Sequence, residues 1–307
     1  MLDLIRFFIF VLFLQSTQVL AREIIVISNP LGPTHSGTPH IVAMIDKANS
    51  LQSRYNFVQE FRVGAFESIS LRHILTAPDR YLAMITNTTA EAVDQGFVKL
   101  ENYVPVFSQG DSCWMVIALT GKDRDLASIR NLKEIVVGTP ALGGATHLAA
   151  LEIGRKYNVP VRMIVFRSNF DALINMAANN GVNFVIERVA NYQQYKDKNP
   201  NMQMLAAQCP TRYPGLPEIP TLGEYGITSP YIWQQLVASR DMDPTRRQEI
   251  KEIITRAELA LGREHIFRIS DQIPPIFAGK TTEQHYQDSW NRLRYQRTKW
   301  QDVFRNP

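Results

Sequence analysis

The sequence predicts an α/β fold with largely parallel strands. Short runs of apolar and β-branched residues alternate with amphipathic helical patterns through most of the chain, which is the order expected when helices connect parallel strands. The 307 residues suffice for two domains, and 45% hydrophobic with 20% charged residues is a normal globular composition. The net charge of +4 is too small for a nucleic-acid-binding surface, so we expect no nucleic-acid partner.

The first residues follow the three-part plan of a secretory signal peptide. Arg6 precedes the apolar run 7–14, which is about half as long as a bilayer span requires. Polar residues then lead to Val19-Leu20-Ala21, which places small side chains at the −3 and −1 positions. We therefore predict a signal peptide over residues 1–21 that is cleaved after Ala21, with an uncleaved anchor as the alternative.

The exported chain opens with a strand at 22–28, a loop at 29–37 and a helix. Thr38 suits the N-cap of this helix and Pro39 its first position, and apolar residues at i, i+3, i+4, i+7 and i+10 give it one buried face. Further elements are expected in this order: a strand at 57–63, a helix at 67–75, a strand at 81–86, a helix that begins at 87–91, a short strand at 103–106, a strand at 114–119 and a small helix at 126–131.

The stretch 134–154 forms a second strand–loop–helix unit. Residues 135–137 are apolar and β-branched, the loop 139–146 is rich in small residues, and an amphipathic helix follows. The first turn of a helix has backbone N–H groups without partners and carries the positive end of the helix dipole. Gly143 and Gly144 let an anion approach these N–H groups, and Thr139 and Thr146 add hydroxyl donors. The alternative is an ordinary turn whose glycines serve close packing.

The remaining elements continue the alternation. They are expected as strands at 161–166, 183–186, 202–209 and 232–239, helices at 168–178 and 243–261, and a final helix that begins with a Thr281–Gln284 capping box. In such folds ligands bind in the loops at the carboxyl ends of the strands, here 30–38, 86–90, 139–147 and 167–171. These loops contain no evident set of acid, base and nucleophile, so we predict no catalytic residue.

Two cysteines, Cys113 and Cys209, lie at the ends of strand-like runs in the exported part. An oxidising compartment permits a disulfide between them, and two buried free thiols are the alternative. No metal-binding motif accompanies them, and we expect neither a metal nor a cofactor.

Three motifs resemble one known family. Gly138–Ala150 reads GTPALGGATHLAA, Pro220–Gly226 reads PTLGEYG, and Pro78–Tyr81 reads PDRY. In content, order and spacing these motifs are similar to those of the Bug or TctC-type periplasmic solute receptors of tripartite tricarboxylate transporters. The resemblance extends from the signal peptide to the last helix.

The resemblance implies a two-lobed periplasmic binding protein of a type II-like kind, with a mixed, mostly parallel sheet in each lobe and a ligand cleft between the lobes. The first lobe would comprise 22–114 with 231–307, and the second 115–230, with the second crossover somewhere within 204–238. Ligand contacts carried over by position fall in loops of both lobes: Ser36, Gly37, Thr38, Thr88 and Thr89 in the first lobe, and Thr139, Gly143, Ala145, Thr146, His147, Ser168 and Asn169 in the second.

Three positions depart from the family pattern. His40 stands where an Asp that could meet a ligand amine is usual, Glu187 replaces a shorter Asp, and Arg80 replaces a Gly. The change at His40 weakens the case for an amino-acid ligand. His147 itself has two interpretations, either as a neutral donor to a ligand carboxylate or as a capping and packing residue.

These features predict a monomeric, non-enzymatic receptor in the periplasm. It would capture a small carboxylate by lobe closure and deliver it to a two-component membrane permease. One alternative is an exported sensor that signals to a partner. The other is a secreted hydrolase, which the absence of a Gly-x-Ser-x-Gly elbow disfavours.

Overall fold

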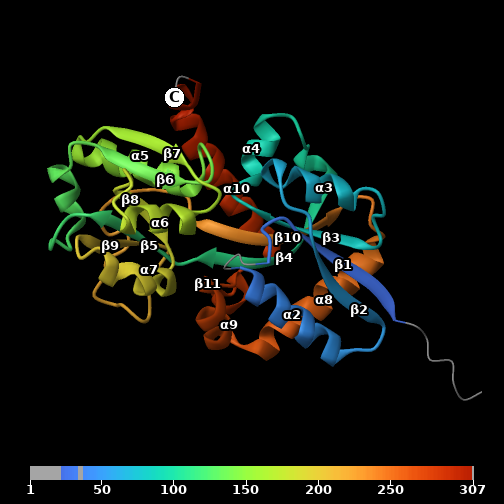
Figure 1. Ribbon diagram of the computed structural model, residues 1–307. Helices are drawn as coiled ribbons and strands as arrows, with labels where there is room; N and C mark the ends of the chain where they lie inside the picture. Colours follow the sequence, from blue (N-terminus) through green and yellow to red (C-terminus); the bar gives the residue numbers. More distant parts are fainter. Residues whose placement is uncertain (1–21, 34–36, 306–307) are drawn as a thin grey trace, which may run out of the picture.

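The computed structural model describes residues 22–33 and 37–305 as two sheets flanked by helices (Figure 1). The predicted signal peptide and the predicted ligand contact Ser36 lie outside the described residues. We call the first sheet with its helices lobe 1 and the second sheet with its helices lobe 2. The α/β class and the two-sheet architecture agree with the prediction.

The first sheet has the order β11-β4-β10-β3-β1-β2. Because β10 runs antiparallel to both β3 and β4, the strands β1 to β4 point one way and β10 and β11 the other. Its strands are β1 (Glu23–Asn29), β2 (Tyr55–Phe61), β3 (Tyr81–Thr86), β4 (Tyr103–Ser112), β10 (Ile232–Ser239) and β11 (Gln272–Ile273).

Helices cover both faces of the first sheet. One face packs against α2 (Thr38–Leu51) and α8 (Pro244–Leu261), and the other against α3 (Ser68–Ile74), α4 (Thr89–Asp94) and α10 (Thr282–Lys299). Alternate strand residues divide between the two cores, as the period of a strand requires: in β3, Leu82 and Met84 belong to the α2 side, and Ala83 and Ile85 to the α10 side. Two short helices, α9 (Arg263–Ser270) and α11 (Gln301–Arg305), complete this lobe.

The second sheet has the order β7-β6-β8-β5-β9. Its strands are β5 (Trp114–Leu119), β6 (Ile135–Thr139), β7 (Val161–Val165), β8 (Phe184–Glu187) and β9 (Met202–Gln208). Only β5 runs against the others, because it pairs antiparallel with β8 and β9. One face packs against α5 (Ala145–Tyr157), and the other against α6 (Asn169–Ala177) and α7 (Val189–Tyr195).

Several elements differ from the sequence prediction. The strand expected at 103–106 continues to Ser112, with a register shift beside Gly110, whose positive φ of 93° suits a β-bulge. A side chain at Gly110 would lie 2.0 Å from the carbonyl oxygen of Ile273, so glycine allows β11 to approach. The helices α7 and α9 were not predicted, because they are only 7 and 8 residues long and a helical period is hard to recognise over two turns.

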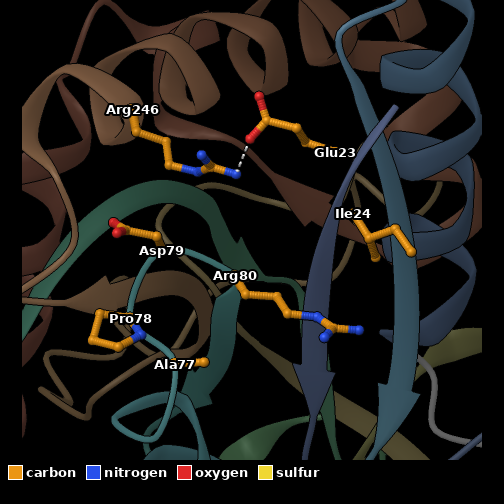
Figure 2. A pocket seen from close by; sticks show the side chains of 7 residues that line it. All are labelled: Glu23, Ile24, Ala77, Pro78, Asp79, Arg80 and Arg246. Carbon is orange, nitrogen blue, oxygen red and sulfur yellow. Dashed lines mark ion pairs between the residues drawn. The ribbon is translucent and has the colours of Figure 1, made fainter. Parts of the chain in front are cut away.

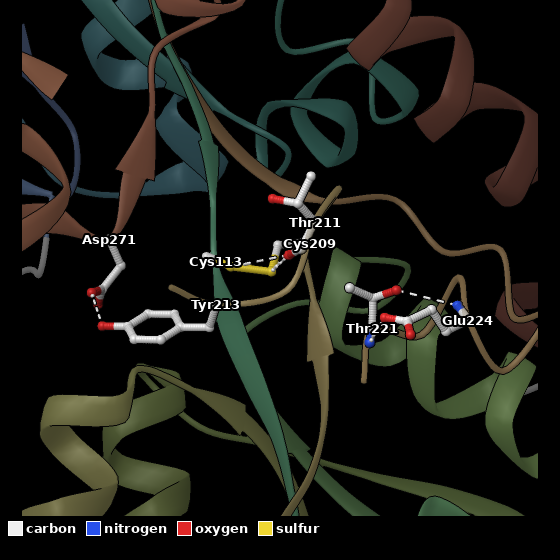
Figure 3. The surroundings of a disulfide bond; sticks show 7 residues. All are labelled: Cys113, Cys209, Thr211, Tyr213, Thr221, Glu224 and Asp271. Atoms are coloured by element: carbon white, nitrogen blue, oxygen red, sulfur yellow. Dashed lines mark hydrogen bonds between the residues drawn. A yellow bond between two sulfur atoms is a disulfide. The ribbon is translucent and has the colours of Figure 1, made fainter. Parts of the chain in front are cut away.

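The chain passes between the two sheets at two places. A disulfide links these two passages. Cys113 lies between β4 and β5, and Cys209 follows β9 at the start of the return to β10. These cysteines form a disulfide, with their Cα atoms 4.8 Å apart. Figure 3 shows the bond beside the segment that leads from β4 to β5. The predicted changes of lobe at 114/115 and 230/231 lie close to these passages, and the exact lobe boundaries remain our proposal.

The PTLGEYG motif closes the second crossover against β9. Thr221 and Glu224 exchange hydrogen bonds between their side chains and backbone N–H groups, and the backbone of Ala207 bonds Pro220 and Leu222 (Figure 3). Arg212 forms an ion pair with the exposed carboxylate of Glu224. The motif therefore has a structural role in this chain.

We expect the disulfide to stabilise the folded chain, because it closes a loop of 96 residues in the unfolded state. Replacing both Cys113 and Cys209 by Ala should lower the free energy of unfolding by about 2–4 kcal/mol in urea denaturation. Reduction of the wild-type chain should reproduce the loss and leave the variant unchanged. Equal urea midpoints for oxidised wild type and variant would contradict the expectation.

Candidate functional site

All predicted ligand contacts except Ser36 lie at the carboxyl ends of parallel strands, or in the loops and first helical turns that follow them. Gly37 and Thr38 follow β1, Thr88 and Thr89 follow β3, and the remaining contacts follow β6 and β7. The carboxyl end of a parallel strand is where open α/β sheets bind ligands, because helix N-termini converge there.

The loop after β6 ends in the uncapped N-terminus of α5. Gly144 is the N-cap residue, so no side chain caps the helix, and the N–H groups of Ala145 and Thr146 have no hydrogen-bond partner among the described residues. The hydroxyl of Thr139, at the end of β6, likewise makes no bond within the described part of the chain. Ala145, Thr146 and Thr139 are all buried. This turn therefore presents donors with unused capacity to an anion.

The N–H groups of the two glycines in this loop are already bonded. Gly143 donates to His147 Nδ1 at 3.1 Å, and Gly144 donates to the carbonyl oxygen of Ala141 at 3.2 Å. Gly143 adopts a left-handed φ of 66°, and a Cβ there would lie 2.5 Å from the Arg297 guanidinium. Glycine is therefore required for the loop conformation, while the open donors lie one and two residues farther along.

His147 packs in the protein interior and bonds the loop before α5, although it does not cap the helix. Its ring is buried, packs against Phe304 with the centroids 5.7 Å apart, and accepts the Gly143 N–H through Nδ1, which therefore carries no proton. Burial, with a smaller contribution from the positive charge of Arg297, lowers the pKa of His147 to about 4. The ring is thus neutral at physiological pH and holds the loop closed.

The loop after β7 lies beside the same turn. Asn169 is buried at the start of α6, and its side-chain oxygen accepts the Thr146 hydroxyl at 3.5 Å. Ser168 caps α6 by accepting the N–H of Asp171 at 3.0 Å. Thr146 and Asn169 are therefore brought together, while the hydroxyl of Ser168 is engaged in its own helix.

The predicted ligand contacts after β1, Gly37 and Thr38, pack against and bond other residues of lobe 1. The hydroxyl of Thr38 donates to the carbonyl oxygen of Gly32 at 2.9 Å. A Cβ on Gly37 would lie 2.3 Å from Gln234 Nε2, so the end of the Gln234 side chain packs directly on this glycine and would have to move to admit a side chain. Gln234 in turn accepts a bond from Gln272 at 2.6 Å.

A buried carboxylate organises the loop after β3. Glu67 accepts the N–H of Thr86 at 3.0 Å, the hydroxyl of Thr86 at 2.6 Å and the hydroxyl of Thr89. Burial raises the pKa of Glu67. The hydroxyl of Thr89 is thus engaged, whereas the hydroxyl of Thr88 makes no bond with the described residues. The role of Glu67 was not evident from the sequence, because its partners are 19 and 22 residues away.

The turn that carries Glu67 has an unusual backbone. Ala65, Phe66 and Glu67 have positive φ values of 45°, 53° and 73° in succession. A side chain with a Cβ disfavours this region, and such outliers persist where the surrounding structure determines them, often beside binding sites. The three bonds to Glu67 provide that constraint here.

A single guanidinium brings loops of the two lobes together. Arg297, near the end of α10, binds the carboxylates of Glu91 and Asp94 in α4, which begins at Thr89. It also donates to the carbonyl oxygens of Leu142 at 3.4 Å and Gly143 at 3.1 Å. Arg297 therefore joins α4, which follows the loop after β3, to the loop after β6.

A second polar contact joins the lobes near the disulfide. Arg188, which follows β8, pairs with Asp271 at 2.5 Å. Figure 3 shows Tyr213, which donates to the same carboxylate at 2.9 Å. The adjacent Glu187 is buried and accepts the N–H of Arg188 at 2.7 Å. Burial raises the pKa of Glu187 to about 7.

Two further departures from the family pattern have structural explanations. His40 is fully buried in lobe 1, bonds Gln272 through Nδ1, and lies 2.9 Å from both carboxylate oxygens of Glu258. Burial lowers its pKa, but the charge of Glu258 and the hydrogen bonds outweigh burial, so the pKa of His40 is raised. Arg80 is exposed at the opposite edge of the sheet, in the turn that leads into β3.

That opposite edge contains a cavity of about 590 Å³ (Figure 2). It lies at the amino ends of β1 and β3 and is lined by Glu23, Ile24, Ala77, Pro78, Asp79, Arg80 and Arg246. Arg246 pairs with Glu23 at 2.7 Å, and Glu23 also lies 3.6 Å from Arg54. Because parallel sheets bind ligands at their carboxyl ends, we do not assign the solute site to this cavity.

The structure also contains a Ser–His–Asp arrangement that the sequence did not suggest. Ser108 lies 2.7 Å from His285 Nδ1, and His285 Nε2 lies 3.3 Å from Asp111. Ser108 is only 1% exposed and sits within β4 beneath α10. A nucleophile must reach its substrate, so this buried arrangement does not favour a hydrolase.

The described residues contain neither a cluster of possible metal ligands nor a membrane-spanning helix. No three His, Cys, Asp or Glu side chains in this part of the chain are arranged to hold a metal ion. None of the described helices is both long and apolar enough to cross a bilayer.

Solved structures resemble this arrangement, although no protein-family model and no curated protein matches the sequence. The periplasmic binding protein BugD is 15% identical, with a TM-score of 0.70 over 92% of this chain and 97% of its own. This chain has the fold of the Bug and TctC periplasmic binding proteins. MatC from Rhodopseudomonas palustris, solved with bound malate, is 16% identical, with a TM-score of 0.68 over 91% and 98% of the two chains. A TctC solute binding protein from Polaromonas, solved without ligand, is 15% identical, with a TM-score of 0.64 over 86% and 95%.

The depressed pKa of His147 predicts an acid-sensitive contribution to stability. In the unfolded chain His147 should titrate near 6.5, whereas the folded state keeps it neutral until about pH 4. The contribution is therefore complete above pH 6.5 and is lost as the pH falls towards 4, by roughly 3 kcal/mol at most.

A His147→Gln variant should lose this pH dependence, because Gln can still accept the Gly143 N–H but does not titrate. The measurement is the unfolding free energy of wild type and variant at several values between pH 4 and pH 7. His265→Gln, which replaces an imidazole that bonds Arg268 within α9, is the matched control and should retain the wild-type slope. Parallel curves for wild type and His147→Gln would show that His147 is not held neutral.

Proposed function

We propose that the protein is a periplasmic solute-binding protein of the Bug or TctC type, and a divergent member of that group. It captures a small carboxylate-bearing solute by lobe closure and delivers it to a tripartite tricarboxylate-type permease. The observation that carries this proposal is the buried first turn of α5, where the N–H groups of Ala145 and Thr146 have no partner among the described residues. A carboxylate satisfies such groups and interacts favourably with the helix dipole.

The polar groups around this turn favour an anionic ligand held by neutral donors. The hydroxyls of Thr139 and Thr88 are available from the second and first lobe, respectively, and Asn169 lies beside Thr146. Arg297, the cation that contacts this loop, is balanced by Glu91 and Asp94. Recognition of a carboxylate by backbone N–H groups and hydroxyls agrees with the bound malate of MatC, which shares the fold.

We also propose that the protein is exported, that it is a monomer and that its partner is a membrane permease. The predicted leader with cleavage after Ala21 supports a periplasmic location, and the fold is that of periplasmic receptors. A receptor of this kind binds and releases its solute unchanged, so we propose no catalytic step. An exported sensor would use the same ligand site, and the presence of a two-part permease in neighbouring genes distinguishes transport from sensing.

A carboxylate that binds the folded chain should raise its melting temperature as the logarithm of excess ligand concentration. We expect at least one stabiliser in a thermal-shift screen of malate, citrate, benzoate and glutamate at millimolar concentration. Malonamide, a neutral diamide of similar size to a short dicarboxylate, is the control and should produce no shift. If no carboxylate in a widened panel of di- and tricarboxylates stabilises the protein, the receptor proposal fails.

A further inference from the structure

The C-terminal helices of lobe 1 lie directly on the loop that we assign to the solute. Figure 1 shows α10 running between α4 on one side and α5 with β6 on the other. Its last turn carries Arg297, and the following helix carries Phe304, which contacts the ring of His147. The same loop thus faces the solute site and the C-terminal end of the chain.

One face of α5 contacts these helices at two successive turns. Leu148 is fully buried in the core cluster that contains Trp290 of α10. One turn later, Glu152 accepts bonds from Lys299 and from Trp300 Nε1 at 2.9 Å. In addition to the two crossovers and the Arg188–Asp271 pair, the chain therefore has a connection between its lobes along α5 and α10.

Arg297 is the part of this connection that reaches the loop itself. Its guanidinium side chain is only 13% exposed, and it bonds Glu91 at 3.0 Å and Asp94 at 2.9 Å on the lobe 1 side. On the lobe 2 side it donates to the carbonyls of Leu142 and Gly143. A planar guanidinium can make several directed bonds at once, which an ammonium group cannot do in this geometry.

We propose that Arg297 is a positioning residue for the solute loop. By fixing the carbonyls of Leu142 and Gly143, it orients the peptide groups that lead to the open N–H groups of Ala145 and Thr146. By binding Glu91 and Asp94, it makes that orientation depend on α4, which begins at the other proposed contact loop. The assignment of the loop to the solute rests on the proposed function, whereas the mechanical role of Arg297 does not.

Amide hydrogen exchange of the ligand-free protein tests the proposal without any solute. The N–H groups of Gly143 and Gly144 are bonded within the loop and report its opening. Arg297→Gln should raise their exchange rates roughly tenfold, the factor expected for loss of one hydrogen bond to a charged group. Arg294→Gln, on the exposed side of the same helix, removes the same charge and should leave these rates unchanged.

A second variant separates positioning from simple packing. The double substitution of Glu91→Gln with Asp94→Asn leaves Arg297 and lobe 2 intact and removes only the carboxylates in α4. If Arg297 links the lobes, exchange at Gly143 and Gly144 should still rise severalfold. Unchanged exchange in this variant and in Arg297→Gln, with both proteins folded by circular dichroism, would overturn the proposal. Because no solute is present, this outcome is independent of whether the receptor function itself holds.

Discussion

The account depends on a set of backbone N–H groups that the fold leaves without partners. The first turn of α5 follows two glycines, so no side chain is available to cap it, and the turn is buried. A buried N–H group without a partner is costly, so the site requires an anion or ordered water. Glycine is favoured at position 143, because its φ of 66° is unfavourable for a residue with a Cβ and because a Cβ there would displace the Arg297 guanidinium. The loop is therefore shaped by its surroundings as well as by its sequence.

The arrangement of the two lobes supports this site from several directions. The disulfide and the pair of Asp271 with Arg188 hold the crossover region, where the chain passes between the sheets. Arg297 connects the lobes at the loops. Lobe motions in binding proteins concentrate where few contacts cross, so these contacts restrict the movements available to the chain. The buried Glu67 has a similar local role, since it fixes the loop after β3.

Much of the fold could be predicted from local sequence patterns. The strands β3 and β5 are apolar or β-branched throughout, β10 is apolar apart from Gln234, Gln235 and Ser239, and the predicted ranges match all three. The second half of β4 was missed because Gln109, Gly110 and Asp111 resemble a turn, although pairing with β10 forces them into a strand. The extent of β4 is therefore set by its pairing with a distant strand, which a local sequence pattern does not reveal.

The site was predictable only in part for a related reason. A glycine-rich loop before a helix identified the α5 turn from the sequence. The sequence did not show that His147 would bond Gly143, or that Thr89 would bond Glu67, because side-chain partners depend on loop shape. The contact of Arg297 with Gly143 could not be predicted from the sequence, because the two residues are 154 positions apart in the chain. Contacts of this kind arise only when the lobes assemble.

The most direct test of the central claim is a map of backbone amide chemical shifts during titration with a stabilising carboxylate. The account predicts the largest changes at Ala145 and Thr146, with smaller changes at Gly143, whose N–H is already bonded to His147. Changes concentrated instead around Glu23 and Arg246, at the opposite edge of the first sheet, would contradict it.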